Sequence, residues 1–312
     1  MRRLFAALAL AVSVLHGNSQ CTCSTSSSDP SVDNGSYDLV LEKGHWLAGL
    51  YGEARKFTVD GTSSEHQHHS NGSSSEMVML QSAGIATADV RYGLSDRITL
   101  GMQLPWLRLV AAPYSATGLG DMNLTATWNF FRRNDLSAAI VLGLELPTGV
   151  RSDIGTETST AIGSGSWDPI AGVNAVKSWR KSFLRAGVFY KYSTYGFEGV
   201  NYGSFVGHSL SYTYEWKEGG NCSSKDSSGT GSAYHINFFA AVNGEFSGQQ
   251  FKSNNVFVSN TGGYILLAQL GTTFGHGKFS MPMSFSLPLF QTYNGMQSPL
   301  VYRVKIGFVR TF

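Results

Sequence analysis

The feature that most constrains this chain is an alternation of apolar and polar residues with a period of two. It recurs in segments of roughly 10–14 residues from Trp46 to the C-terminus. In the last segment one face carries Leu300, Tyr302, Val304, Ile306, Phe308 and Phe312, and the other carries Arg303, Lys305, Gly307 and Thr311. Successive side chains of a strand point to opposite faces, so this pattern predicts an all-β protein whose strands each have one apolar side.

Soluble β-sandwiches alternate too, but three features favour a transmembrane barrel. Large aromatic residues lie near segment ends on the apolar face, as an interfacial girdle requires: Trp106, Trp128, Tyr192 and Trp216. The chain stops on Phe312 at the end of an alternating strand, which resembles the C-terminal insertion signal of bacterial outer-membrane proteins. Arg310 departs from that signal, which usually has an apolar residue there.

The third feature is the length of the connections. Short ones are expected at 93–96, 132–135, 180–182 and 275–278, and longer ones at 60–76, 111–119, 149–163 and 247–260. Short periplasmic turns and longer outer loops give this alternation. The segments predict an antiparallel up-and-down barrel of twelve strands over 45–312, with ten or fourteen as alternatives. Only closure leaves no unpaired edge in lipid.

The N-terminus predicts export. Met1-Arg2-Arg3 precedes an apolar run from Leu4 to Leu15, and small residues around Gly17 and Ser19 offer a cleavage site, so 1–19 are expected to be a secretory signal. Asn18 and Gln20 do not suit a lipid anchor on Cys21. Residues 20–44 then form a Ser/Thr-rich periplasmic tail, which could also enter the lumen as a plug.

Composition excludes several classes of protein. Only 14% of residues are charged, while 36 are glycine and 12% are aromatic. A chain this apolar does not stay disordered, and it is too poor in charge for an ordinary soluble helical protein. The formal net charge of +2 indicates no nucleic-acid partner. The expected partners are outer-membrane lipid, the barrel-assembly machinery and a small-molecule solute.

Four stretches resemble a known family. They are Tyr92-Gly93-Leu94-Ser95-Asp96-Arg97, Gly118-Leu119-Gly120-Asp121, Leu144-Glu145-Leu146-Pro147-Thr148-Gly149 and Ile162-Gly163-Ser164-Gly165-Ser166-Trp167-Asp168. Their order and spacing are similar to those of the outer-membrane transporter family first named for the meta-pathway of phenol degradation. The resemblance covers about Ala86 to Tyr195. It implies a barrel that passes small, often aromatic or apolar, molecules, and it carries over no functional residues. We expect Pro105 and Pro147 at strand ends.

The lumen is the first candidate site. The alternation turns seven basic and four acidic residues inward: Glu53, Arg55, Asp89, Arg91, Arg97, Glu145, Arg185, Lys191, Glu215, Arg303 and Lys305. Charges on the lipid face would cost roughly 2–4 kcal/mol each at the midplane. A mixed set suits a wetted channel for polar or weakly anionic solutes. The alternative is a salt-bridged plug of side chains that fills a narrow barrel.

The segment around His66, His68 and His69 is the second candidate, because neutral imidazoles bind transition metals. It would make the protein a metal-binding surface barrel with a weakly held ion; otherwise no cofactor is expected. The same segment contains His68-His69-Ser70-Asn71-Gly72, which resembles the catalytic stretch of outer-membrane phospholipase A, with His68 as base and Ser70 as nucleophile. The upstream motif of that family is missing, so we expect no enzyme.

Three cysteines remain after the signal. Cys21 and Cys23 lie in the tail and Cys222 in the connection from Lys217 to Ser232, which strand parity places on the periplasmic side. A disulfide between the tail and this connection is one hypothesis. The pairing cannot be deduced from the sequence.

Overall fold

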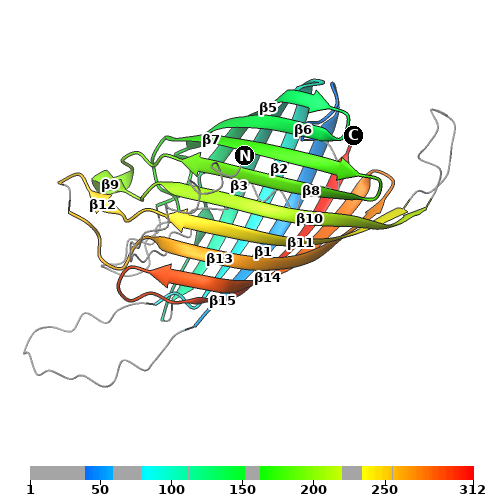
Figure 1. Cartoon of the computed structure of the whole chain (residues 1–312). Coiled ribbons are helices and arrows are strands. Elements are labelled where there is room, and N and C mark those ends of the chain that lie inside the picture. The colour runs from blue at the N-terminus through cyan, green and yellow to red at the C-terminus, as the bar shows by residue number, and fades with distance from the viewer. Residues whose placement is uncertain (1–38, 59–78, 112, 152–161, 220–233, 255) are drawn as a thin grey trace, which may run out of the picture.

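The computed structural model describes residues 39–58, 79–111, 113–151, 162–219, 234–254 and 256–312. These residues form a closed antiparallel barrel (Figure 1). The sheet runs in the order β2-β1-β15-β14-β13-β11-β10-β8-β7-β6-β5-β3-β4, and pairing of β2 with β3 closes it. β4 and β5 pair with successive parts of β3 and together occupy one strand position in the wall. The barrel therefore has twelve strand positions, as predicted.

The strand bounds follow the chain. They are β1 Trp46–Phe57, β2 Ser82–Ser95, β3 Ile98–Ala111, β4 Tyr114–Leu119, β5 Met122–Arg133, β6 Leu136–Leu146, β7 Asp168–Trp179, β8 Ser182–Lys191, β9 Val200–Asn201, β10 Phe205–Gly219, β11 Tyr234–Ser247, β12 Phe251–Lys252, β13 Gly263–His276, β14 Phe279–Tyr293 and β15 Leu300–Thr311. A 3-10 turn, η1, covers Phe197–Gly199. No helix in the described ranges is long and apolar enough to cross a membrane.

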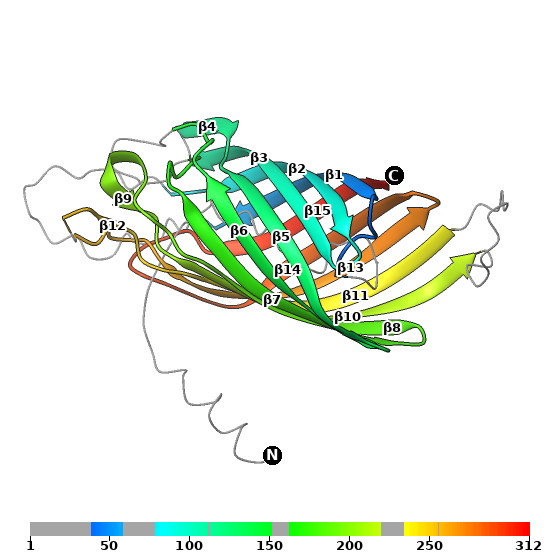
Figure 2. The ribbon, with the colours of Figure 1, turned by 90° about the horizontal axis from the view of Figure 1, so that it is seen from above.

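The two ends of the barrel differ in their connections. At the end where β1 begins and β15 stops, called here the terminal end, two-residue turns join β2 to β3, β5 to β6, β7 to β8 and β13 to β14. Asn134 and Gly277 take positive φ in two of these turns, which tight hairpins require. At the opposite loop end β9 pairs with β12 beside the barrel (Figure 2). Phe312 N–H donates to Trp46 C=O and fastens the last strand to the first.

The outer face is apolar, as the alternation predicted. Trp106, Trp128, Tyr192 and Trp216 are all exposed on it. An outward apolar belt of this kind is what the hydrocarbon of a bilayer requires. Arg310 also faces outward near the terminal end, where its guanidinium lies over the rings of Phe279 and Phe312. The aromatic rings thus surround the one charge that departed from the insertion pattern.

Three sequence predictions about strands were wrong. Residues 111–119 are not a long loop, because β3 continues to Ala111 and β4 begins at Tyr114. Pro105 lies inside β3, at the point where β3 changes partner from β5 to β4. The Pro105 C=O accepts from Gly120 N–H, so the nitrogen of Pro105 also points toward the break between β4 and β5. Its lack of an N–H therefore removes no hydrogen bond of the sheet.

Leu300 is the third error. It is only 2% exposed and faces inward, whereas Tyr302 faces outward. The register of β15 against β1 shifts here, because Lys56 pairs with Tyr302 but Phe57 pairs with Leu300. The Gln291 side chain holds the start of β15 in this position: its Oε1 accepts from Leu300 N–H at 3.1 Å and its Nε2 donates to Leu300 C=O at 3.2 Å.

An apolar cluster fills one side of the lumen near the loop end. It consists of Phe57, Leu80, Ala83, Ile85, Leu107, Leu109, Ala111, Ala116, Ile162, Leu267 and Leu300, with Ile265 packed against it. The inward faces of β1, β2, β3, β4, β13 and β15 supply most of its members, and Leu80 and Ile162 come from the connections before β2 and β7. The interior of an outer-membrane barrel is usually polar, so this inner apolar cluster is a specific feature of the lumen.

Candidate functional site: the inner face of the barrel

The barrel wall turns most of the predicted lumen residues inward. The predicted lumen residues that are buried or partly buried on the inner face are Glu53, Arg55, Asp89, Arg91, Glu145, Arg185, Lys191, Glu215, Arg303 and Lys305. Arg97 is placed differently. It lies in the two-residue turn between β2 and β3, and its side chain is exposed at the terminal end. The alternation predicted an inward side chain for Arg97, but β2 ends at Ser95 and β3 begins only at Ile98.

Four of these residues, Glu53, Arg55, Arg303 and Lys305, form what we call the ionic cluster together with Glu245 of β11. The register of β1 against β15 sets Glu53 opposite Lys305 and Arg55 opposite Arg303. Glu53 pairs with the guanidinium of Arg55, and Arg303 Nε lies 3.4 Å from the same carboxylate. The Lys305 ammonium lies 5.6 Å from the centre of the Tyr51 ring.

Arg303 also pairs with Glu245, through two bonds of 2.7 and 3.0 Å from Nη1 and Nη2. Glu245 belongs to β11, and β13 and β14 lie between β11 and β15 in the wall. The ion pair therefore spans the lumen as a chord. A bidentate guanidinium–carboxylate pair is the strongest of the common ion-pair geometries. Such a chord braces the barrel from inside.

A second polar chain lines the wall beside the ionic cluster. Asn243 Nδ2 donates to Gln269 Oε1, and Gln269 Nε2 donates to Ser284 Oγ at 2.9 Å. These residues lie on β11, β13 and β14. On β2, Arg91 bonds Asp89 two residues away, at 2.8 Å between Nη2 and Oδ2. These ion pairs and hydrogen bonds offset the loss of water for the groups that form them.

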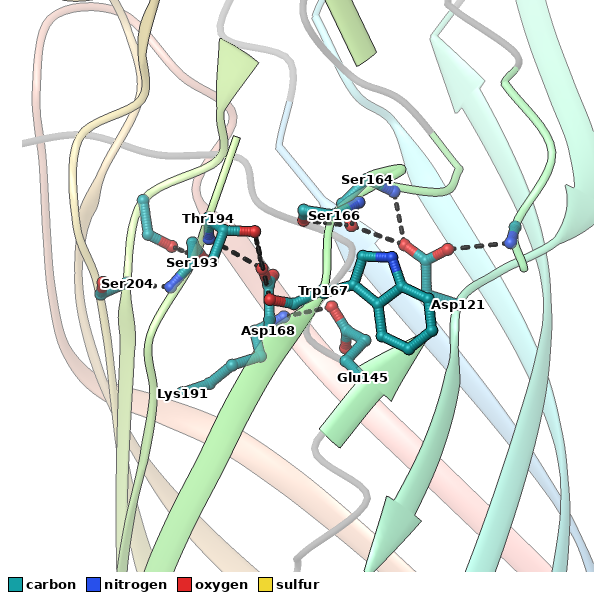
Figure 3. Close-up of polar contacts among 12 residues, drawn as sticks. Asp121, Glu145, Ser164, Ser166, Trp167, Asp168, Lys191, Ser193, Thr194 and Ser204 are labelled. Carbon is teal, nitrogen blue, oxygen red and sulfur yellow. Dashed lines mark hydrogen bonds and ion pairs between the residues drawn. The ribbon is translucent and has the colours of Figure 1, made fainter. Parts of the chain in front are cut away.

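Three of the four family-like stretches converge on one carboxylate at the loop end (Figure 3). Asp121 Oδ1 accepts from Gly149 N–H at 2.8 Å, and Oδ2 accepts from the N–H and the hydroxyl of Ser164. Ser166 Oγ in turn donates to Ser164 Oγ at 2.8 Å. Asp121 therefore fastens both ends of the connection between β6 and β7 to the break between β4 and β5. The sequence singled out these stretches but not this role.

The close approach of these stretches explains two of their glycines. A Cβ on Gly149 would lie 2.7 Å from the Cα of Gly163, and a Cβ on Gly163 would meet Gly149 at the same distance. Both backbones touch where Asp121 draws them together. Any side chain at either position would push the two segments apart.

Beside Asp121, two further carboxylates face the lumen. Glu145 pairs with the Lys191 ammonium at 2.8 Å, and both are buried. Asp168 Oδ1 accepts from Thr194 N–H at 2.8 Å and fixes the exit from β8. Figure 3 shows the two groups side by side on β6, β7 and β8. Among the described residues no group of three or more His, Cys, Asp or Glu has the geometry to hold a metal ion.

Below these groups most of the inner wall is uncharged, and Arg185 of β8 is the exception among the described residues. We call the uncharged part the neutral strip: the inward, partly exposed residues Thr125, Thr127, Val141, Gly143, Ile170, Gly172, Asn174 and Gly187 of β5 to β8. They are small or neutral, and none reaches across the lumen. In the order of the sheet, β7 and β8 lie opposite β1 and β15, so the neutral strip faces the ionic cluster across the barrel.

The last described residues of the tail lie at the terminal mouth. Val40 is buried, and Leu41 N–H donates to the inward-facing Thr99 hydroxyl at 2.7 Å. Leu41 also packs against Leu47, Tyr51 and Val309. The chain thus passes along the inner wall before β1 begins.

Several predicted residues lie outside the described ranges. They are the histidines His66, His68 and His69 with Ser70, the cysteines Cys21, Cys23 and Cys222, and the signal segment 1–19. The metal-binding, phospholipase, disulfide and export hypotheses therefore remain predictions. The insertion role of Phe312 also remains one, although its backbone contact with Trp46 is described.

Comparison with known proteins places the fold. No family model matches the chain, and no curated protein matches it. Among solved structures it is similar to a COG4313 outer membrane channel from Pseudomonas putida F1, with a TM-score of 0.62, 17% identity, and coverage of 90% of this chain and 100% of that one. It is more distantly similar to the NanC porin, with a TM-score of 0.44, 9% identity, and coverage of 84% and 98%.

A third similar structure is LpxR from Salmonella typhimurium, with a TM-score of 0.41, 10% identity, and coverage of 85% of this chain and 100% of that one. At these identities the likeness shows the fold alone. The closed wall, the apolar outer belt and the likeness to the COG4313 channel agree on one architecture. The protein is a twelve-stranded β-barrel of the bacterial outer membrane.

Proposed function

We propose that the barrel is a channel through which small molecules cross the outer membrane by passive diffusion. The observation that carries the proposal is the neutral strip: its inward side chains remain partly exposed, while Arg55 and Arg303 of the opposite wall are buried in ion pairs. The resemblance to the meta-pathway transporter family and the likeness to an outer-membrane channel support the same function.

The lining also supports a class of solute. The apolar cluster offers buried hydrocarbon inside the lumen, which suits aromatic or apolar molecules. The ionic cluster beside it carries three cations against two carboxylates. We propose that the lumen therefore admits neutral and weakly anionic molecules in preference to cations. The tail around Leu41 would narrow the terminal mouth without sealing the neutral strip.

Single-channel recording in a planar bilayer tests the proposal. We expect discrete conductance steps with weak anion preference, and we expect Lys305→Gln to shift the reversal potential toward cations because Lys305 faces the lumen. Lys56→Gln is the matched control, since Lys56 is exposed on the outer face of β1. A barrel that migrates as folded in the heat-modifiability assay but stays silent would mean a filled lumen.

A further inference from the structure

The ionic cluster and the apolar cluster share a border. On β1, Phe57 of the apolar cluster follows Arg55 by two residues, so both side chains point inward one above the other. Phe57 pairs with Leu300, which precedes Arg303 on β15. On the neighbouring wall Glu245 pairs with Ile265, which packs against the same cluster. Charged groups thus meet buried hydrocarbon along one line inside the lumen.

The charges at this border are not balanced. Glu53 is shared by Arg55 and Arg303, and Glu245 is taken by Arg303. Lys305 has the Tyr51 ring beneath it and no carboxylate of its own among the ion pairs of the described residues. Three cations therefore stand against two carboxylates. One more negative charge would neutralise the group.

Arg55 points to where that charge belongs. Its side chain is 6% exposed, and its Nη2 has no hydrogen-bond acceptor among the described residues. A buried guanidinium donor that no group accepts is costly, and a carboxylate is the acceptor whose geometry fits it best. Lys305, Thr87 and Ile265 face inward nearby and stay partly exposed, so a solute in the lumen can reach this part of the wall.

We propose that this border is a binding site for an amphiphilic carboxylate, a molecule with one carboxylate on an apolar body. The carboxylate accepts from Arg55 Nη2 and lies near the Lys305 ammonium, while the apolar body packs against Phe57, Leu300 and Ile265. The proposal deepens the proposed channel function and rests on its premise that small molecules enter the lumen. Amphiphilic carboxylates are a class of solute that neither a polar pore nor a purely apolar conduit would select.

Isothermal titration of the barrel in lipid nanodiscs with 4-phenylbutyrate tests the site. We expect 4-phenylbutyrate to bind saturably. Its neutral counterpart 4-phenylbutanol and the shorter acid acetate, which lacks the apolar body, should both bind more weakly. Loss of one charge-assisted hydrogen bond predicts that Arg55→Gln weakens 4-phenylbutyrate about tenfold or more. Lys56→Gln, the adjacent outward residue, should leave the affinity unchanged.

Arg55 pairs with Glu53, so Arg55→Gln could fail to insert. Lys305→Gln is the second variant, because Lys305 is only partly buried and should weaken 4-phenylbutyrate in the same direction. Equal affinity for acid and alcohol would overturn the proposal, and so would acetate or inorganic phosphate displacing the acid at similar concentration. Binding without conductance would refute the channel and keep the site. Conductance without binding of 4-phenylbutyrate would refute the site and keep the channel.

Discussion

The ionic cluster and the neutral strip occupy facing walls of one barrel, and their side chains use the lumen in opposite ways. In the cluster, Arg303 reaches from β15 to Glu245 on β11, across the space between the strands. In the strip, Val141 and its neighbours end close to their own strands and stay partly exposed. One wall fills the interior and the other leaves room.

The cause is the cost of an unpaired charge. An ion inside a narrow barrel loses water, so it must approach an opposite charge even when that partner sits several strands away. Threonine, glycine and valine have no such requirement and do not cross the lumen. The number of charges that face inward therefore does not mark the path of a solute. The uncharged wall marks it better.

Among substitutions that test the contrast between the ionic cluster and the neutral strip, Arg303→Leu is expected to lower the free energy of unfolding most. The change leaves Glu245 without its bidentate partner and removes one of the two guanidinia beside Glu53. Removing one member of a buried pair costs about 3–5 kcal/mol because the other charge stays buried. Urea unfolding in lipid vesicles, followed by tryptophan fluorescence, measures the loss.

The double variant Arg303→Leu with Glu245→Leu is its control. It removes both ends of the chord and leaves the Arg55–Glu53 pair in place. Most of the stability should return, because an apolar pair of similar size often replaces a buried ion pair without loss. If the single variant were as stable as the original protein, the chord would not be a brace.

A smaller effect is expected from filling the neutral strip. Val141→Trp puts a large ring on its inward, partly exposed face between Thr127 and Gly172. We expect the single-channel conductance to fall by about half, because conduction follows the bore of the pore-lining groups. Leu142→Trp is the matched control on the same strand, since Leu142 faces lipid and is 59% exposed. Equal conductance in both variants would move the path away from the strip.

Much of this fold follows from the sequence because a period of two is a local property. It predicted the twelve strands, the apolar belt and the short turns at the terminal end. It failed where the ladder is irregular. Val301 has no pairing partner between Tyr302 and Leu300, so the predicted face of Leu300 is reversed. The break between β4 and β5 likewise hid β4 inside an expected loop.

The site was less predictable, because partners depend on how distant strands meet. Alternation turned Arg303 inward but could not name Glu245, which the sequence analysis missed. The available signal was its place in the alternating segment of β11, with Asn243 on the same face. Asp121 and Asp168 were missed for a similar reason. Their stretches were recognised, yet their shared contacts with Gly149, Ser164 and Thr194 exist only after closure.

The smallest change in stability is expected for Asn174→Leu on the neutral strip. Asn174 faces inward and is partly exposed, and its side chain makes no hydrogen bond with any described residue. The exchange therefore removes no partner and leaves no group stranded, so stability should change by no more than about 0.5 kcal/mol. The same urea unfolding in vesicles measures it beside Arg303→Leu. A loss near that of Arg303→Leu would mean that both walls carry the fold, and the division between a bracing wall and an open wall would fail.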